Sequence, residues 1–321
     1  MPLPSGDLQS ASGAQPRPTG EVAGLEGPLL AALHPALLQR FGDLNLGLRD
    51  AAPGRCSLSD LVVHPGACLG AFLDMEAEAH PGMDRKAGAA FFLSHLALAL
   101  LHPVAAMAAL HGVVPLLHGD GVALRAEFYD WQHAGRSGRA VRLHLLVDPG
   151  CRTTAPEGEE ALRLAVHDLA IALLSPVIPA LHRPSGLSAG ALWRIVADMA
   201  CLAFLRVGEV LGEDEAQRGR AIGVTRRPGS PLNNGRSGFL HVALHAPGTS
   251  HVPGTSHVPR KSNAPGETAR LITERWFLQR GGCCRYYTFS DGQKCPTCVL
   301  RPEAEQRAIL AEHLVALHAP G

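Results

Sequence analysis

The stretch DRKAGAAFFLSHLALALLHPVAAMAALH, residues 84–111, carries the strongest helical signal of the chain. Asp84 stands where a helix N-cap is expected, and no Asp, Glu, Lys or Arg occurs from Ala87 to Gly119. An uncharged run of this length could cross a bilayer. Its histidines and Pro103 would be costly against lipid, so we predict two buried core helices, residues 88–101 and 103–111, followed by a strand.

Further helices and a small sheet are predicted on both sides of this stretch. Alternating apolar residues predict three strands of an antiparallel sheet, beginning at Val113, Val122 and Ala140. The other predicted helices are residues 24–41 with an interruption at Pro35, a short piece before Leu69 capped by Ser57 or Ser59, residues 157–174, residues 188–211 with Ser188 as N-cap, and residues 267–278. The predicted fold class is α+β: a mainly helical body with a small central antiparallel sheet and a C-terminal cysteine cluster module.

The composition and the N-terminus limit the classes of function. Hydrophobic residues make up 46% of the 321 residues, and 29 Lys and Arg balance 29 Asp and Glu. A neutral chain lacks the basic excess of a general nucleic-acid surface, so we predict no nucleic-acid partner. Residues 1–20 have neither the basic nor the apolar region of a secretory signal. The predicted location is therefore the cytoplasm, where a peripheral contact with the inner membrane face stays open.

Four regions are predicted along the chain. Residues 1–23 are rich in Pro, Ser and Gly and read as a disordered tail, and residues 24–240 form the helical body. Residues 241–266 contain the repeat HAPGTS-HVPGTS-HVPRKS and are predicted to be a flexible insertion. A metal-binding histidine tract is the alternative, but six-residue spacing through Pro and Gly gives no compact ligand set. Residues 267–321 form the cysteine module.

Half of the chain's eight cysteines gather in RGGCCRYYTFSDGQKCPTCVLRPEAE, residues 280–305. The clustered ones are Cys283, Cys284, Cys295 and Cys298, whereas Cys56, Cys68, Cys151 and Cys201 are predicted to be ordinary thiols. Asp291 and Gly292 form a hairpin turn signal. Such a turn would bring Cys283 and Cys284 beside Cys298 and leave Cys295 within about 10 Å. Four thiolates can therefore converge on one metal centre.

Three interpretations of the spacing C-C-x10-C-x2-C stay open on the residues alone. A structural zinc site usually takes two spaced pairs, and only Cys295 with Cys298 has that form. A redox dithiol would use the CPTC motif, but no thioredoxin-like pattern precedes it. A 2Fe-2S cluster takes four thiolates, two per iron, and tolerates irregular spacing better than zinc does.

The segment GCCRYYTFSDGQKCPTCVLRP, residues 282–302, resembles the C-terminal cluster motif of FhuF-like ferric-siderophore reductases. The resemblance implies a 2Fe-2S cluster as cofactor and one-electron reduction of a ferric siderophore, the hydroxamate type being a candidate. It implies four cluster ligands: Cys283, Cys284, Cys295 and Cys298. The catalytic residues stay unknown. The body, residues 24–240, is expected to supply the cleft for the ferric siderophore. The chemistry is consistent, because siderophores hold ferric iron through charged oxygens and hold ferrous iron far more weakly.

The neighbouring residues and the missing motifs complete the prediction. Arg280, Arg285, Lys294 and Arg301 would favour a reduced, more negative cluster, and Trp276, Tyr286, Tyr287 and Phe289 would pack the module or shield it from water. The chain has no P-loop and no complete dinucleotide fingerprint, so the electron must come from an external donor protein or reductant.

Two other functions are compatible with the sequence. One is a non-enzymatic siderophore-binding or interaction protein whose cysteines hold structural zinc. The other is an electron-transfer protein that serves another reaction. A redox-active chromophore separates the first from a reductase, and turnover of ferric chelates separates the second.

Overall fold

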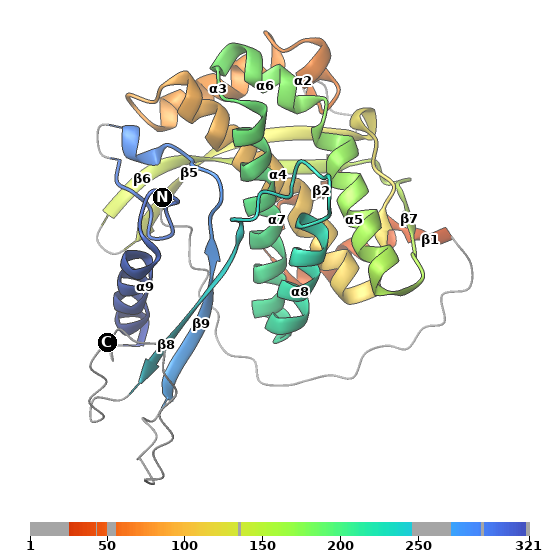
Figure 1. Ribbon diagram of the computed structural model, residues 1–321. Helices are drawn as coiled ribbons and strands as arrows, with labels where there is room; N and C mark the ends of the chain where they lie inside the picture. Colours follow the sequence, from red (N-terminus) through yellow and green to blue (C-terminus); the bar gives the residue numbers. More distant parts are fainter. Residues whose placement is uncertain are drawn as a thin grey trace.

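The computed structural model describes residues 26–42, 44–49, 56–133, 136–245, 271–289 and 292–318. The predicted N-terminal tail lies outside these residues, and so does the histidine repeat apart from His245. Within them the fold is mainly helical with three small sheets (Figure 1). The predicted α+β class is confirmed.

Two long helices, α4 (Arg85–His111) and α7 (Ala189–Leu211), pack against each other in the centre of the molecule (Figure 1). Both predicted N-caps form: the Asp84 carboxylate accepts a hydrogen bond from Ala87 N at 2.6 Å, and the Ser188 hydroxyl accepts one from Ala191 N at 3.2 Å. The α4 helix is long and apolar enough to cross a membrane, but 83% of its apolar window is buried inside the structure. It is therefore the core helix that the sequence predicts.

The predicted division of α4 at Pro103 is wrong, because one helix continues through it to His111. Proline removes the hydrogen bond to the residue four positions earlier. Here Pro103 and its neighbours on both sides are buried, so packing holds the helix together across the missing bond. The predicted interruption at Pro35 is also wrong, because α1 runs from Leu30 to Arg40 without a break, although Pro35 itself is exposed.

The other described helices are shorter, and most of them pack against this pair or against one another. They are α1 (Leu30–Arg40), α2 (Asp60–Val63), α3 (Cys68–Ala79), α5 (Gly158–Leu174), α6 (Val177–Ser185), α8 (Asp214–Thr225) and α9 (Glu303–His318). The α5 and α6 helices are long and apolar enough to cross a membrane only when they are counted together, and the pair is bent by 46°. The sequence analysis placed α1, α2 and α5 and did not foresee α6, whose sequence contains several prolines. Pro176 is the N-cap of α6, a position that proline tolerates.

The central sheet has the order β2-β6-β5-β3. Its strands are β2 (Leu46–Leu48), β3 (Cys56–Ser57), β5 (Val122–His133) and β6 (Arg136–Val147). The long β5–β6 hairpin is the predicted antiparallel pair, with Val122 opposite Val147. The β2 strand runs parallel to β6, so the sheet is mixed rather than purely antiparallel. A second, antiparallel sheet joins β1 (Glu26–Leu29), β7 (Arg152–Thr154) and β4 (Val114–Pro115).

A separate hairpin carries the C-terminal part of the molecule. The strands β8 (Gly238–His245) and β9 (Leu271–Gln279) pair antiparallel, with Gly238 opposite Gln279. The helix predicted over residues 267–278 is therefore wrong. Residues 241–245, which the sequence analysis placed in a flexible insertion, belong to β8. The α9 helix covers this hairpin by packing Leu310 and Leu314 against Leu240 and Val242.

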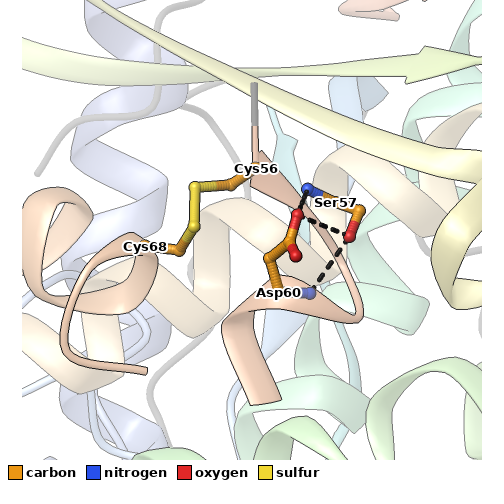
Figure 2. The surroundings of a disulfide bond; sticks show 4 residues. All are labelled: Cys56, Ser57, Asp60 and Cys68. Atoms are coloured by element: carbon orange, nitrogen blue, oxygen red, sulfur yellow. Dashed lines mark hydrogen bonds between the residues drawn. A yellow bond between two sulfur atoms is a disulfide. The ribbon is translucent and has the colours of Figure 1, made fainter. Parts of the chain in front are cut away.

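A disulfide between Cys56 and Cys68 corrects the prediction that these residues are ordinary thiols. Their Cα atoms lie 5.9 Å apart, within bridging distance, because β3 and the start of α3 meet around the short α2 (Figure 2). Ser57 caps α2: its hydroxyl accepts a hydrogen bond from Asp60 N at 3.0 Å, and the Asp60 carboxylate accepts one from Ser57 N at 2.8 Å. The bridge and this reciprocal cap fix α2 at both ends.

Removing the disulfide is expected to lower the free energy of unfolding by about 3 kcal/mol, because the bridge closes a short loop in the unfolded chain. The double variant Cys56→Ala/Cys68→Ala tests this in urea, with circular dichroism as the readout and the wild type in the same metal state beside it. Cys151→Ala, which removes a half-buried free thiol, is the control. A double variant with the wild-type urea midpoint would show that the bridge does not form in solution.

Candidate metal centre

The cysteine segment leaves β9 at Gln279 and runs over the surface of the helical body to α9. Asp291 lies outside the described residues, and the described residues on either side of it form no strands. The described residues therefore show no strand pairing of the kind that the predicted hairpin turn would require. Instead Arg285 adopts a left-handed conformation with φ of 61°, and residues Tyr286–Thr288 form a single 3-10 turn.

All four predicted ligands line one small hollow that has essentially no free volume inside it: Cys283, Cys284, Cys295 and Cys298. None of them is in a disulfide. Cys298 is buried and the other three are half-buried. Across the described residues no group of three or more His, Cys, Asp or Glu side chains has a ready metal-binding arrangement. The hollow therefore gathers the thiols without presetting their coordination geometry.

The thiols differ in their protonation. A hydrogen bond with Cys295, assisted by the charge of Arg280, lowers the pKa of Cys284 to about 5 although burial opposes this. The same hydrogen bond, together with burial, raises the pKa of Cys295. Within this pair Cys284 therefore gives up its proton more readily than Cys295 does. Metal ligation requires thiolates, and the hollow already stabilises one of them.

Arg280 places a positive charge under the thiols. Its side chain is 14% exposed, and Cys284, Asp198 and Cys295 stabilise its charge against the cost of burial. Its Nε atom is buried without a hydrogen-bond partner and lies 3.7 Å from an oxygen of Asp198. The positive charge of this buried guanidinium beside Cys284 and Cys295 favours a negatively charged group at the thiols. Four thiolates with a 2Fe-2S cluster are such a group, so the residues fit the cofactor that the sequence implies.

Asp198, in the middle of α7, fastens the cysteine segment to the helical body. Its side chain is fully buried and accepts three hydrogen bonds, from Ser237 Oγ at 2.6 Å, Gly281 N at 2.7 Å and Gly282 N at 2.9 Å. These bonds pull the residues just before Cys283 against α7. The sequence analysis missed Asp198, although a lone carboxylate inside the apolar run LWRIVADMACLAFL was a usable signal.

The two glycines before the cysteines permit this close approach. A Cβ atom on Gly282 would lie 3.0 Å from Ile195 N and 3.1 Å from the carbonyl carbon of Arg194, which are backbone atoms of α7. A Cβ atom on Gly281 would lie 2.6 Å from Ser237 Oγ. Any larger residue would push the cysteine segment away from α7. The sequence Arg-Gly-Gly therefore positions the first two thiols.

Two of the aromatic residues near the cysteines pack the segment against α4. Phe289 is buried with Ala87 and Phe91 of α4, and Cys284 and Tyr286 pack against this group. Tyr287 is 38% exposed, and Trp276 lies on β9 beneath the guanidinium of Arg218. Tyr286 and Phe289 therefore attach the cysteine segment to the helical body, the simpler of the two roles that the sequence analysis gave to the aromatics.

Arg301 holds the second pair of cysteines. Its guanidinium donates to Cys295 O at 3.1 Å and to Lys294 O at 2.9 Å. Gln306, in the first turns of α9, donates to Cys298 O at 3.2 Å. The start of α9 therefore lies beside Cys298.

The fold and the hollow define an α+β protein with a C-terminal site of four free cysteines. In comparison with known families, residues 90–219 match the family model described as "Ferric iron reductase FhuF-like transporter". The match confirms the resemblance to the FhuF-like family, and it does so from the helical body rather than from the cysteines. It ends before the cysteine segment, so it does not include the proposed 2Fe-2S motif. No curated protein matches the chain.

Proposed function

We propose that this protein reduces the ferric iron of a siderophore by one electron and so releases it as ferrous iron. The family supports a role related to ferric iron reduction. The observation that carries the finer proposal is the gathering of four free cysteines in one hollow beside the buried charge of Arg280. The proposed ligands of a 2Fe-2S cluster are Cys283, Cys284, Cys295 and Cys298.

A 2Fe-2S cluster suits this hollow better than zinc does. Adjacent ligands such as Cys283 and Cys284 are awkward around one tetrahedral ion, whereas two irons can take them separately. When bound, the cluster supplies a site that accepts and donates single electrons. The chain's own residues stabilise its negative charge through Arg280 and limit the access of water through Tyr286 and Phe289.

The reaction is balanced by an external reductant. One electron enters from a reduced carrier protein or a chemical reductant, and Fe(III) in the chelate becomes Fe(II). Ferrous iron binds the charged oxygens of the chelator weakly, so it dissociates without any covalent bond of the siderophore being broken. The proposed setting is the cytoplasm, at the inner face of the membrane through which the chelate arrives.

Metal analysis after anaerobic purification tests the cofactor. We expect about two irons and two sulfides per chain, visible absorption, and an electron-spin-resonance signal that appears only after dithionite. Ferric chelates added to the reduced protein should then lose their ferric absorption as the iron is reduced. The protein should at the same time regain the absorption spectrum of its oxidised form. A colourless protein with about one zinc per chain would contradict the proposal and favour a structural zinc site in a siderophore-binding protein.

A further inference from the structure

The thiols of the cysteine hollow lie close to the protein surface. Three of the four, Cys283, Cys284 and Cys295, are half-buried. Tyr287 lines the hollow and is 38% exposed, and Leu300, two residues after the last cysteine, is 49% exposed. A partner that docks here would therefore meet apolar side chains directly beside the thiols.

Basic residues from separate elements surround these apolar side chains. Lys294 lines the hollow itself and is exposed. Arg194, in the second turn of α7, is also exposed, and its carbonyl carbon lies 3.1 Å from the position of a Cβ atom on Gly282. Because Gly282 lines the hollow, the backbone of Arg194 lies directly beside it.

Arg236 belongs to the loop before β8 and lies near the same site. It is exposed, and its backbone N donates a hydrogen bond at 2.8 Å to Asn234 Oδ1. That oxygen lies 2.7 Å from the position of a Cβ atom on Gly281, two residues before the first cysteine. Arg194, Arg236 and Lys294 together are the basic surface around the cysteine hollow.

The positive charge of the basic surface is not neutralised by its neighbours. Nearby, Arg285 pairs with Asp84, and Arg301 pairs with Glu305. Within the part of the chain that the structure describes, the three residues of the basic surface form no such ion pair. The whole chain balances 29 basic residues against 29 acidic ones, so this local excess is not a general property of the protein. A surface of this kind attracts an acidic partner.

We propose that the basic surface is the docking site for an acidic one-electron carrier protein, which supplies the electron for the proposed reduction. The inference rests on the proposed function, because a reductase without a complete dinucleotide fingerprint needs an external donor. Exposed apolar side chains beside a group of charges match a protein partner. A small anionic reductant would gain nothing from Tyr287 and Leu300.

Docking of this kind is short-lived and depends on salt. Electron-transfer encounters use small interfaces, and opposite charges speed the meeting of the two proteins. The range of these charges falls from about 30 Å at 0.01 M salt to about 3 Å at 1 M salt. In the transfer the carrier loses one electron and the oxidised centre gains it, so no bond forms or breaks. The rate of electron entry should therefore fall as salt is added.

An acidic flavodoxin is a suitable probe, because its flavin hydroquinone becomes the semiquinone by giving up one electron. Stopped-flow absorption follows the semiquinone after mixing with the oxidised holoprotein, and titration calorimetry with oxidised flavodoxin measures the affinity. In Arg194→Glu/Arg236→Glu, the second-order rate constant and the affinity should each fall at least about tenfold at low salt. The difference from the wild type should largely vanish at about 0.5 M salt.

Arg49→Glu/Arg125→Glu is the matched control, because it changes the net charge by the same amount. Both arginines are exposed, and neither lines the cysteine hollow. This variant should keep the wild-type rate and affinity. The methyl viologen radical is a small cation that needs no protein docking site. Reduction of the holoprotein by this radical should not fall in either double variant, and both variants should keep their iron.

Three results would overturn the docking site: wild-type rate and affinity in Arg194→Glu/Arg236→Glu, an equal loss in the control, or a wild-type rate that does not fall with salt. Reduction of ferric chelates driven by methyl viologen would in each case still support the proposed function. If Arg194→Glu/Arg236→Glu impairs only the viologen-driven reduction of an anionic ferric chelate, the basic surface serves the chelate, and the inference is also overturned. Salt-dependent flavodoxin binding by a protein that reduces no ferric chelate would uphold the docking site and refute the proposed function.

Discussion

Replacing Asp198 by alanine is expected to detach the cysteine segment from α7 and to lower the free energy of unfolding by about 3–5 kcal/mol. The substitution leaves the Ser237 hydroxyl and the N–H groups of Gly281 and Gly282 without their acceptor. It also leaves the buried guanidinium of Arg280 without its carboxylate neighbour. Buried donors that lose their partner cost more than the bond itself contributed. Urea unfolding followed by circular dichroism measures the loss.

The charge state of Asp198 makes asparagine an informative second variant. Burial raises the pKa of Asp198, whereas Arg280, Ser237 and the two backbone N–H groups lower it. Ser237 and the two backbone N–H groups donate hydrogen bonds and Arg280 supplies a positive charge, so the ionised carboxylate matches its surroundings. An asparagine side chain would turn an NH₂ group towards at least one donor. We therefore expect Asp198→Asn to be nearly as harmful as Asp198→Ala.

The iron content of the same variants shows whether Asp198 acts on the proposed site. Both should lose iron when the segment moves away from α7, even under conditions where the helical body stays folded. Asp130→Ala is the control, because its carboxylate is 86% exposed and its ion pair with Arg139 contributes little. A loss of less than about 1 kcal/mol at Asp198 would show that the buried network does not hold the segment.

The core helices were predictable because their signals are local. Asp84 and Ser188 each accept a hydrogen bond from the backbone N–H group three residues further along the chain. The apolar residues that follow each of them are continuous in the sequence. The β5–β6 hairpin has the same advantage, since its two strands follow one another directly along the chain. In each case the interacting groups can be recognised within one short window.

The errors concern contacts between distant parts of the chain. The β9 strand pairs with β8 across a long intervening segment, and within β9 the burial pattern alternates only weakly. A short window therefore fits a helix equally well. The Cys56–Cys68 bridge depends on how β3 and α3 are placed by β5, which the spacing of two cysteines does not reveal.

In the cysteine hollow, too, some features could be predicted from the local sequence, whereas others depend on residues far apart in the chain. The four cysteines were recognisable from their spacing and from the family resemblance. The predicted hairpin between them was not found in the described residues, because the segment follows Asp198 and the aromatic group on α4 rather than its own strand pairing. Gly281 lies 83 residues from Asp198. No local pattern could connect them, although the buried carboxylate and the Arg-Gly-Gly sequence were each visible.

Replacing Cys284 by alanine is expected to abolish iron binding and to reduce the rate of ferric chelate reduction at least about a hundredfold. Loss of a group that only orients a metal ligand costs 10–100-fold, and here a proposed ligand itself is removed. Cys284 forms a hydrogen bond with the Cys295 thiol and stabilises the charge of Arg280, so its loss also removes a partner from both side chains. Visible absorption, iron analysis and single-turnover reduction of a ferric trihydroxamate measure the effect.

Cys201→Ala is the matched control for this experiment. Cys201 is a free, buried cysteine on α7 that does not line the cysteine hollow. Burial raises its pKa to about 12, so its side chain remains a neutral thiol, which does not bind metal. The control should keep its iron and its rate, with at most a loss of stability from the smaller side chain. If Cys284→Ala keeps both iron and activity, the electron reaches the chelate by another route. If Cys284→Ala instead loses zinc, the four cysteines are a structural clasp and the protein is not a cluster-dependent reductase.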